Sequence, residues 1–172
     1  QLAKKAGPDH YVKVKRPLAV DLEVCVLQEK LAEDGRYPVI YCSDMKGFKL
    51  PYCTNLFGSY ELLGMALDIN PDTLRRIGKA EVLEEYRRRL NSPKPVQWVA
   101  PTEAPVKDLV MEGKDVDLGM LPIPKHSELD SGKCIAIGAT ISKGADKGIP
   151  NMGIYRHKVK GRSKLSCLLA PV

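Results

Sequence analysis

The residues best suited to chemistry lie in Lys147–Arg156, where an asparagine and an arginine flank a run of strand-like residues. Asn151 offers a neutral oxygen ligand, and Arg156 offers a permanent cation with a planar fork of N–H donors. At the mouth of a strand, the pair could hold a metal-bound phosphate and a carboxylate substrate. The alternative is a hairpin with one exposed arginine. From this stretch alone the hairpin is favoured, because short motifs are weak evidence.

His126 and Asp130 form a second candidate, because an imidazole and a carboxylate four residues apart could act as an acid/base pair. Asp130-Ser131-Gly132 also has the composition of an ordinary turn, and the turn is the favoured interpretation. The three histidines show neither HxH nor HExxH spacing, so they do not by themselves make a zinc site. The five cysteines contain no CxxC pair, which argues against a disulfide framework and favours reduced thiols.

Composition limits the possible partners. The chain has 172 residues, 44% of them hydrophobic, so it can bury the core of one domain or slightly more. Its net charge of +6 favours anionic ligands, but the basic residues are scattered and aromatic residues are few. We therefore predict no nucleic-acid partner. No apolar run approaches the roughly 18 residues of a membrane span, so we predict a soluble, cytoplasmic protein with no membrane partner.

The first part of the chain has the pattern of one helix and two short strands. Residues 1–20 are basic and contain helix breakers, which predicts an irregular start. Asp21 can then cap a helix that extends to Asp34. Strands are predicted at Pro38–Cys42 and Lys49–Leu56. This order is typical of the beginning of an α/β layer.

Three further helices are expected before the middle of the chain. Ser59 can cap the first, which runs to Leu67, and Asn70-Pro71 can begin the second with Asn as the cap. The third covers residues 80–90. Its charged side chains suggest two pairs four residues apart, Glu84–Arg88 and Glu85–Arg89. Each such pair is worth only about 0.3 kcal/mol, so we attribute these charges to solubility rather than to function.

A proline-rich connector at residues 91–105 is the best candidate for a domain boundary. Residues 121–124 must be extended, because a residue before proline is pushed away from the helical region. Alternating patterns then predict three strands, at Cys134–Ser142, Gly153–Val159 and Leu165–Leu169. We therefore predict a mixed α+β fold, with an N-terminal α/β domain at residues 1–105 and a β-rich domain at residues 106–172.

Three stretches, taken in order, together resemble the UbiD family of reversible decarboxylases. Asn55-Leu56-Phe57-Gly58-Ser59 is similar to the family signature that follows a strand and opens a helix. Asp130-Ser131-Gly132-Lys133-Cys134-Ile135 resembles its Asp-x-Gly-x-Tyr-Ile/Leu element, with Cys134 where the family often has an aromatic residue. Asn151-Met152-Gly153-Ile154-Tyr155-Arg156 is similar to its most specific element. The resemblance extends over roughly residues 20–172.

The resemblance implies an activity and a set of cofactors. UbiD-like enzymes add CO2 to, or remove it from, aromatic, heteroaromatic or α,β-unsaturated carboxylic acids. They use prenylated FMN, which a flavin prenyltransferase supplies, together with a divalent metal, usually Mn2+, and K+. Their cofactor lies in a split β-barrel, so the β-rich second half of this chain would be the first, incomplete part of that barrel. A homo-oligomer, either a dimer or a hexamer, is implied for the full-length protein.

The resemblance also implies roles for single residues. Asn151 would be a metal ligand, with the metal bridging to the cofactor phosphate, and the backbone carbonyl of Met152 would face the potassium site. Residues Gly153 to Tyr155 would line the flavin. Arg156 would contact both the cofactor and the substrate carboxylate, and would be the catalytic arginine of a Glu–Arg–Glu network.

The chain departs from the family in length. The family's metal-binding His and Glu, and the glutamates that pair with Arg156, would lie beyond Val172. We expect residues 1–172 alone to be poorly stable and inactive, because a sheet that stopped there would expose unpaired strand edges. Two alternatives stay open: a non-catalytic UbiD-like scaffold subunit of a larger complex, and an ordinary FMN split-barrel oxidoreductase. The sequence determines neither the substrate nor the direction of the reaction.

Overall fold

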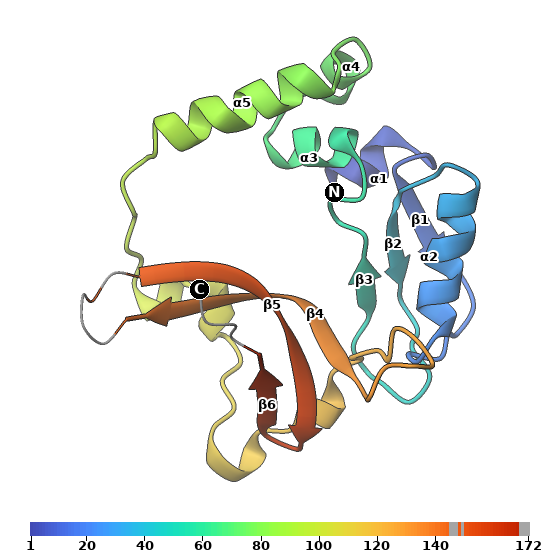
Figure 1. Cartoon of the computed structure of the whole chain (residues 1–172), viewed down its shortest axis with the longest axis vertical. Helices are drawn as coiled ribbons and strands as arrows, with labels where there is room; N and C mark the ends of the chain where they lie inside the picture. The colour runs from blue at the N-terminus through green and yellow to red at the C-terminus, as the bar shows by residue number, and fades with distance from the viewer. Residues whose placement is uncertain (145–147, 149, 169–172) are drawn as a thin grey trace.

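The computed structural model describes residues 1–144, 148 and 150–168, and shows two small sheets with helices around the first of them (Figure 1). The helices are α1 (Leu2–Ala6), α2 (Glu23–Glu33), α3 (Tyr60–Ala66), α4 (Pro71–Leu74) and α5 (Lys79–Asn91). The strands are β1 (Tyr11–Val14), β2 (Val39–Cys42), β3 (Tyr52–Thr54), β4 (Cys134–Lys143), β5 (Pro150–Gly161) and β6 (Lys164–Cys167). This arrangement confirms the predicted mixed α+β fold.

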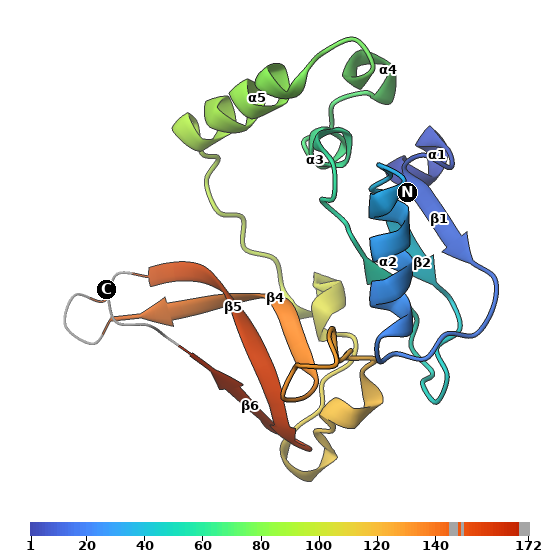
Figure 2. The same ribbon diagram turned by 45° about the vertical axis from the view of Figure 1, so that its right-hand side comes forward.

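The first sheet is covered by helices on both faces. Its central strand β2 runs parallel to β1 and antiparallel to β3. Because successive side chains of a strand point to opposite faces, Val39 and Ile40 enter different apolar clusters. Ile40 packs with Val24 of α2, and Val39 packs with Leu62 of α3. Figure 2 shows α2 alongside β1 and β2, with α3 set apart from it.

The second sheet is an antiparallel meander in the order β4–β5–β6. β4 and β5 form a long hairpin, and β4 carries a bulge between Ile135 and Gly138. β6 pairs only with the last part of β5, from His157 to Gly161. Among the described residues, the first part of β5, residues 150–156, therefore pairs only with β4 and keeps one edge open.

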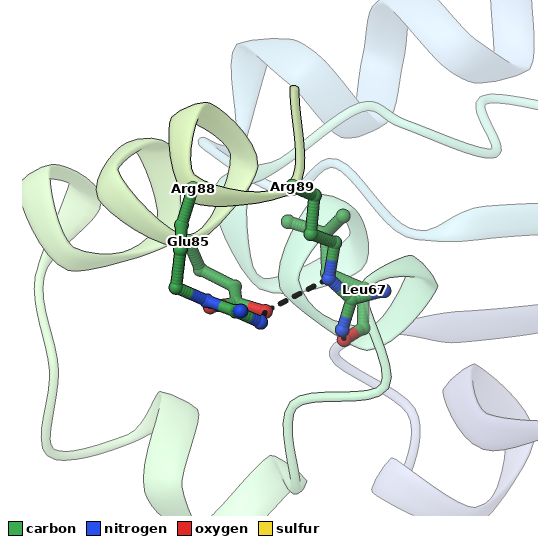
Figure 3. A network of polar contacts seen from close by, with 4 residues as sticks. All are labelled: Leu67, Glu85, Arg88 and Arg89. Carbon is green, nitrogen blue, oxygen red and sulfur yellow. Dashed lines mark hydrogen bonds and ion pairs between the residues drawn. The ribbon is translucent and has the colours of Figure 1, made fainter. Parts of the chain in front are cut away.

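Helix α5 is attached to the end of α3 through arginine (Figure 3). Arg89 donates one hydrogen bond to the Leu67 carbonyl and another, from Nε at 2.8 Å, to Glu85. Arg88 pairs with Glu85 as well, and these bonds lower the pKa of Glu85 to about 2. The predicted pair Glu85–Arg89 is confirmed, whereas Glu84 lies 3.9 Å from Arg87 rather than beside Arg88. The charges of α5 therefore hold a helix in place, a role that the sequence-based prediction did not assign.

Local predictions near the N-terminus were partly wrong. Residues 1–20 contain α1 and β1 rather than an irregular start. β1 is a four-residue edge strand that β2 completes by hydrogen bonding, and so short a strand leaves little periodic signal. Asp21 does not cap α2, because Leu22 precedes the helix and the Asp21 carboxylate accepts a hydrogen bond from Lys125 N instead.

Later elements follow the predictions more closely. Ser59 caps α3 by accepting a hydrogen bond from Leu62 N, and α4 begins at Pro71. The predicted strand Lys49–Leu56 is shorter, since β3 covers only three residues. β4, β5 and β6 lie where strands were expected, although Leu169 is outside the described residues. None of the described helices combines the length and the apolar character that crossing a membrane requires.

Candidate functional site

The stretch that opened the sequence analysis lies on β5, except for its beginning, where Lys147 and Ile149 are outside the described residues. Its pairing with β4 is regular from residue 151 to residue 155. Side chains therefore alternate, so that residues 151, 153 and 155 share one face and residues 152, 154 and 156 share the other. Asn151 and Arg156 consequently project from opposite faces of the strand. A single ligand can contact both only by reaching around the open edge of β5.

The face that carries Arg156 is apolar and exposed. We use the name "platform" for the side chains of Ile137, Ala139, Ile141, Met152 and Ile154. Met152 is paired with Ile141, and Ile154 with Ala139. The side chains of Ile141 and Ile154 are each 75% exposed. An exposed apolar surface of this kind marks a place where a ligand or another part of a protein can pack.

The opposite face carries a histidine that glycine accommodates. His157 Nε2 lies 2.8 Å from the Thr140 hydroxyl oxygen. A Cβ atom on Gly138 would overlap the His157 ring, and one on Gly153 would overlap the Tyr155 ring. These two glycines of the hairpin therefore make room for rings. Thr140 and Gly138 were not among the predicted site residues, because their contacts with β5 depend on a strand register that local sequence does not specify.

The structure brings the second and third family-like stretches together. Arg156 Nη2 lies 3.7 Å from Asp130 Oδ1, and the Asp130 Oδ2 atom accepts a hydrogen bond from Ser127 N at 3.1 Å. Two residues further along β5, Lys158 Nζ donates a 2.6 Å hydrogen bond to the Ser131 hydroxyl. Asp130 therefore belongs to the surroundings of Arg156.

The proposed acid/base pair of His126 and Asp130 does not form. No hydrogen bond joins the two side chains in the described part of the chain, and Asp130 faces Arg156 instead. His126 Nδ1 is buried without a hydrogen-bond partner among the described residues. The imidazole lines a cavity and has no acidic partner there, so the interpretation of Asp130-Ser131-Gly132 as a turn is supported.

The first family-like stretch shapes a turn and one wall of that cavity. Asn55 adopts a left-handed conformation with φ 61°, and its Nδ2 donates a 2.9 Å hydrogen bond to the Pro38 carbonyl. A side chain at Gly58 would overlap that amide, which explains the glycine. The cavity has a volume of about 490 Å³ and lies between residues 54–58 and residues 134–137. The first two stretches thus lie at the junction of the two sheets. The third runs along β5 and approaches the second only at Arg156.

Charge and burial set the chemistry of the remaining groups. Burial raises the pKa of the Cys25 thiol, and the nearby Asp130 carboxylate raises it further. The described residues contain no group of three His, Cys, Asp or Glu side chains that could hold a metal. Asn151 can therefore offer one neutral oxygen to a metal, but the described residues do not complete a metal site around it.

Comparisons with known proteins divide the chain into two matched segments. Residues 2–81 match the family model described as the 3-octaprenyl-4-hydroxybenzoate carboxy-lyase N-terminal domain. Residues 97–171 match the model of the Rift-related domain of the same carboxy-lyase, named UbiD. The chain belongs to the UbiD family. Together the two matched segments cover most of the chain.

Solved structures show the same fold. The UbiD-class enzyme HmfF from Pelotomaculum thermopropionicum, in an evolved dimeric form in complex with prFMN, is 28% identical, with a TM-score of 0.77 over 94% of this chain and 35% of that chain. Vanillic acid decarboxylase from Sedimentibacter hydroxybenzoicus, in an open form, is 25% identical, with a TM-score of 0.80 over 92% of this chain and 33% of that chain. The apo 3,4-dihydroxybenzoic acid decarboxylase from Enterobacter cloacae is 19% identical, with a TM-score of 0.79 over 98% of this chain and 35% of that chain. At that identity the likeness shows the fold alone. This UbiD-family chain therefore spans about a third of the length of these structures.

Proposed function

We propose that this UbiD-family chain contributes the flavin-facing and substrate-facing part of a reversible, non-oxidative decarboxylase that uses prenylated FMN. Its substrates would be aromatic, heteroaromatic or α,β-unsaturated carboxylic acids, with CO2 as product or co-substrate. The observation that carries the proposal is Arg156 at the end of the platform, on the same face as Met152 and Ile154. A planar apolar ring system and a carboxylate need those two features side by side.

The platform suits a flavin ring. Its side chains come from two paired strands, so their tips form one surface that can cover one side of a ring and exclude water from it. Prenylated FMN, when bound, would supply the electron sink for the loss of CO2. Arg156 would bind the substrate carboxylate through its N–H donors and orient the acid toward the ring. One guanidinium nitrogen approaches Asp130, which leaves other donors of Arg156 for the carboxylate.

The metal sites are part of the same proposal. Asn151 would give one oxygen ligand to Mn2+ or another divalent cation, and cofactor phosphate oxygens would add negatively charged ligands. The backbone carbonyl of Met152 would face K+. Gly153 and Tyr155 would line the cofactor on the Asn151 face. Because Asn151 and Arg156 lie on opposite faces, the cofactor would have to cross the open edge of residues 150–156.

We infer that residues 1–105 form the N-terminal α/β domain and residues 106–172 the first part of a split-barrel flavin domain. A flavin prenyltransferase would supply the cofactor, and the full-length protein would assemble as a dimer or hexamer in the cytoplasm.

The proposal is tested on the protein as it is encoded, co-expressed with a flavin prenyltransferase. We expect mass spectrometry and the absorption spectrum to show bound prenylated FMN, and a panel of carboxylic acids to contain one that releases CO2. Arg156→Ala should lower turnover at least about a hundredfold, since a charge that stabilises the transition state is lost. Arg162→Ala is the matched control, because Arg162 also carries an ion pair, 3.2 Å from Asp117, but lies at the β5–β6 turn.

Each outcome points to one function. Absence of the prenylated flavin, or full activity in Arg156→Ala, would contradict the proposal. Bound flavin without turnover on any acid would favour the non-catalytic scaffold subunit. Hydride transfer with ordinary FMN would favour the split-barrel oxidoreductase.

A further inference from the structure

The surroundings of Arg156 contain an acidic group that the proposed reaction does not use. Asp130 Oδ1 lies 3.7 Å from Arg156 Nη2, and the Asp130 side chain is 22% exposed, whereas that of Arg156 is 60% exposed. The aspartate is thus the more buried partner, and its carboxylate also accepts the Ser127 N–H. A long side chain loses much rotamer freedom when it is held, so a fixed anion can decide where the guanidinium lies.

The loop that carries Asp130 is attached at both ends. On the α2 side, Asp21 Oδ1 accepts a hydrogen bond from Lys125 N at 2.9 Å, and Leu22 N donates to the Lys125 carbonyl at 3.1 Å. At the base of the loop, Cys134 N donates to the Pro124 carbonyl at 3.1 Å. These contacts close the loop and fix it to the beginning of α2.

The sheet holds the same loop from the other side. Val159 N donates to the Lys133 carbonyl at 3.0 Å, and Lys158 Nζ donates to the Ser131 hydroxyl. Within the loop, the Asp130 carboxylate also accepts the Ser127 N–H. The carboxylate is therefore anchored by its own turn while it faces Arg156, and a movement of Asp130 would require several of these bonds to break.

We propose that Asp130 is a positioning residue that holds the Arg156 guanidinium at the end of the platform. The proposal rests on the proposed function for its kinetic consequence, although the contact itself does not. Because one nitrogen of Arg156 is engaged at 3.7 Å, the guanidinium keeps donors for a substrate carboxylate. A neighbouring anion also weakens the attraction of Arg156 for a second anion. Asp130 therefore improves the orientation of the Arg156 guanidinium and lowers its affinity for the substrate carboxylate.

These two opposing effects predict that loss of the Asp130 charge lowers kcat without raising KM. In Asp130→Asn the amide oxygen can still accept the Ser127 N–H, so the turn is kept while the charge is removed. Turnover should fall about tenfold or more, because misplacing a catalytic group by about 1 Å costs up to a hundredfold. KM should stay the same or decrease, because the competing anion is gone. A purely structural role would instead leave kcat unchanged in the folded fraction.

Asp117→Asn provides a close control. Asp117 also accepts a backbone N–H, from Gly119 at 2.8 Å, and also pairs with an arginine that follows β5, Arg162 at 3.2 Å. The control therefore removes an equivalent charge from an equivalent turn, away from the platform. It should leave both kcat and KM within about twofold, since exposed ion pairs contribute little.

A second readout separates this inference from the proposed function. The Arg156 side-chain Nε–H resonance is assigned by its loss in Arg156→Lys, in uniformly ¹⁵N-labelled protein without flavin. In Asp130→Asn this resonance should shift and broaden, and in Asp117→Asn it should not change while the Arg162 resonance shifts. An unchanged Arg156 resonance in Asp130→Asn would overturn the inference even if the protein proves to be a flavin-dependent decarboxylase. A shifted resonance in a protein with no such activity would overturn only the proposed function.

Discussion

Single residues on the β4–β5 hairpin show how nearby rings, on the paired strand or on the same one, limit side-chain size. Gly138 lies beneath the His157 ring, and that ring is held by the Thr140 hydroxyl group 2.8 Å away. On β5 itself, Gly153 makes room for the ring of Tyr155, which lies two residues further along the same strand. On the face that carries His157, small and large side chains alternate, so the rings occupy the space above the glycines. The opposite face carries the platform and Arg156.

Gly138→Ala tests this packing. The added Cβ would overlap the His157 ring, which cannot move without losing its contact with Thr140. We expect a loss of about 1–3 kcal/mol in the free energy of unfolding, the usual cost of overpacking, measured by chemical denaturation. In Gly161→Ala the Cβ would meet no atom within 4 Å, so the change should stay within about 0.5 kcal/mol. Equal stability of the two variants would show that His157 is free to rearrange.

Among the helices, α5 shows how an element with little apolar surface is attached. Val82 is its one buried side chain among the described residues. Arg89 adds a polar attachment, because it donates hydrogen bonds both to Glu85 and to the Leu67 carbonyl at the end of α3. Lone carbonyls at the end of a helix are a natural target for such a donor. The attachment therefore depends on one arginine more than on the rest of the basic run.

Arg89→Ala should release the last turns of α5. The variant loses the bond to the Leu67 carbonyl and the bond to Glu85 together. Hydrogen exchange should become faster for amides of α5 and for those at the end of α3. Arg87→Ala is the control, because within the described part of the chain the Arg87 side chain has only a 3.9 Å contact with the exposed Glu84. Exchange in that variant should stay as in the parent protein. Similar exchange rates in the two variants would contradict the attachment.

The same cluster predicts a dependence on pH. Hydrogen bonds from Arg88 and Arg89 lower the pKa of Glu85 from 4.5 to about 2 in the folded chain. A lowered pKa means that the ionised carboxylate stabilises the fold above pH 4.5, and this contribution is lost as the pH falls from about 4.5 towards 2. We expect α5 amides to lose protection over that interval. Glu85→Gln should remove this part of the pH dependence, and an unchanged acid profile in that variant would contradict the assignment.

The success of sequence-based prediction for these elements depended on whether the deciding contact is local. Ser59 caps α3 through a bond to a residue three positions later, and that bond was predicted correctly. The partner of Asp21 is Lys125, 104 residues away, so a local pattern suggested the wrong role for Asp21. The three family-like stretches could be found from their order, but the contact between Asp130 and Arg156 could not, because it depends on how the loop crosses the sheet.

At the scale of the whole molecule, one loop contacts both the helix-covered first sheet and the second sheet. Residues 125–133 contact the beginning of α2 through Asp21 and Leu22, and contact β5 through Arg156 and Lys158. The cavity of about 490 Å³ lies at the same junction, with β3 and the following turn on one side and β4 on the other. The placement of the first sheet relative to the platform therefore depends on polar contacts of this loop as well as on apolar packing.

Asp21→Ala tests that dependence. The substitution removes the acceptor of the Lys125 N–H and the 3.8 Å contact with Lys133, while the cores on both faces of the first sheet stay intact. We expect the free energy of unfolding to fall by about 1 kcal/mol, and hydrogen exchange to become faster at Lys125 and through the loop to Lys133. Asp108→Ala is the control, since Asp108 is exposed and its carboxylate has no hydrogen bond or ion pair within the described ranges. Faster exchange in the loop, together with a shift of the Arg156 resonance, would show that the beginning of α2 helps to place the arginine through the loop. Faster exchange in the loop with an unchanged Arg156 resonance would show that the Asp130 turn alone holds Arg156, without help from Asp21.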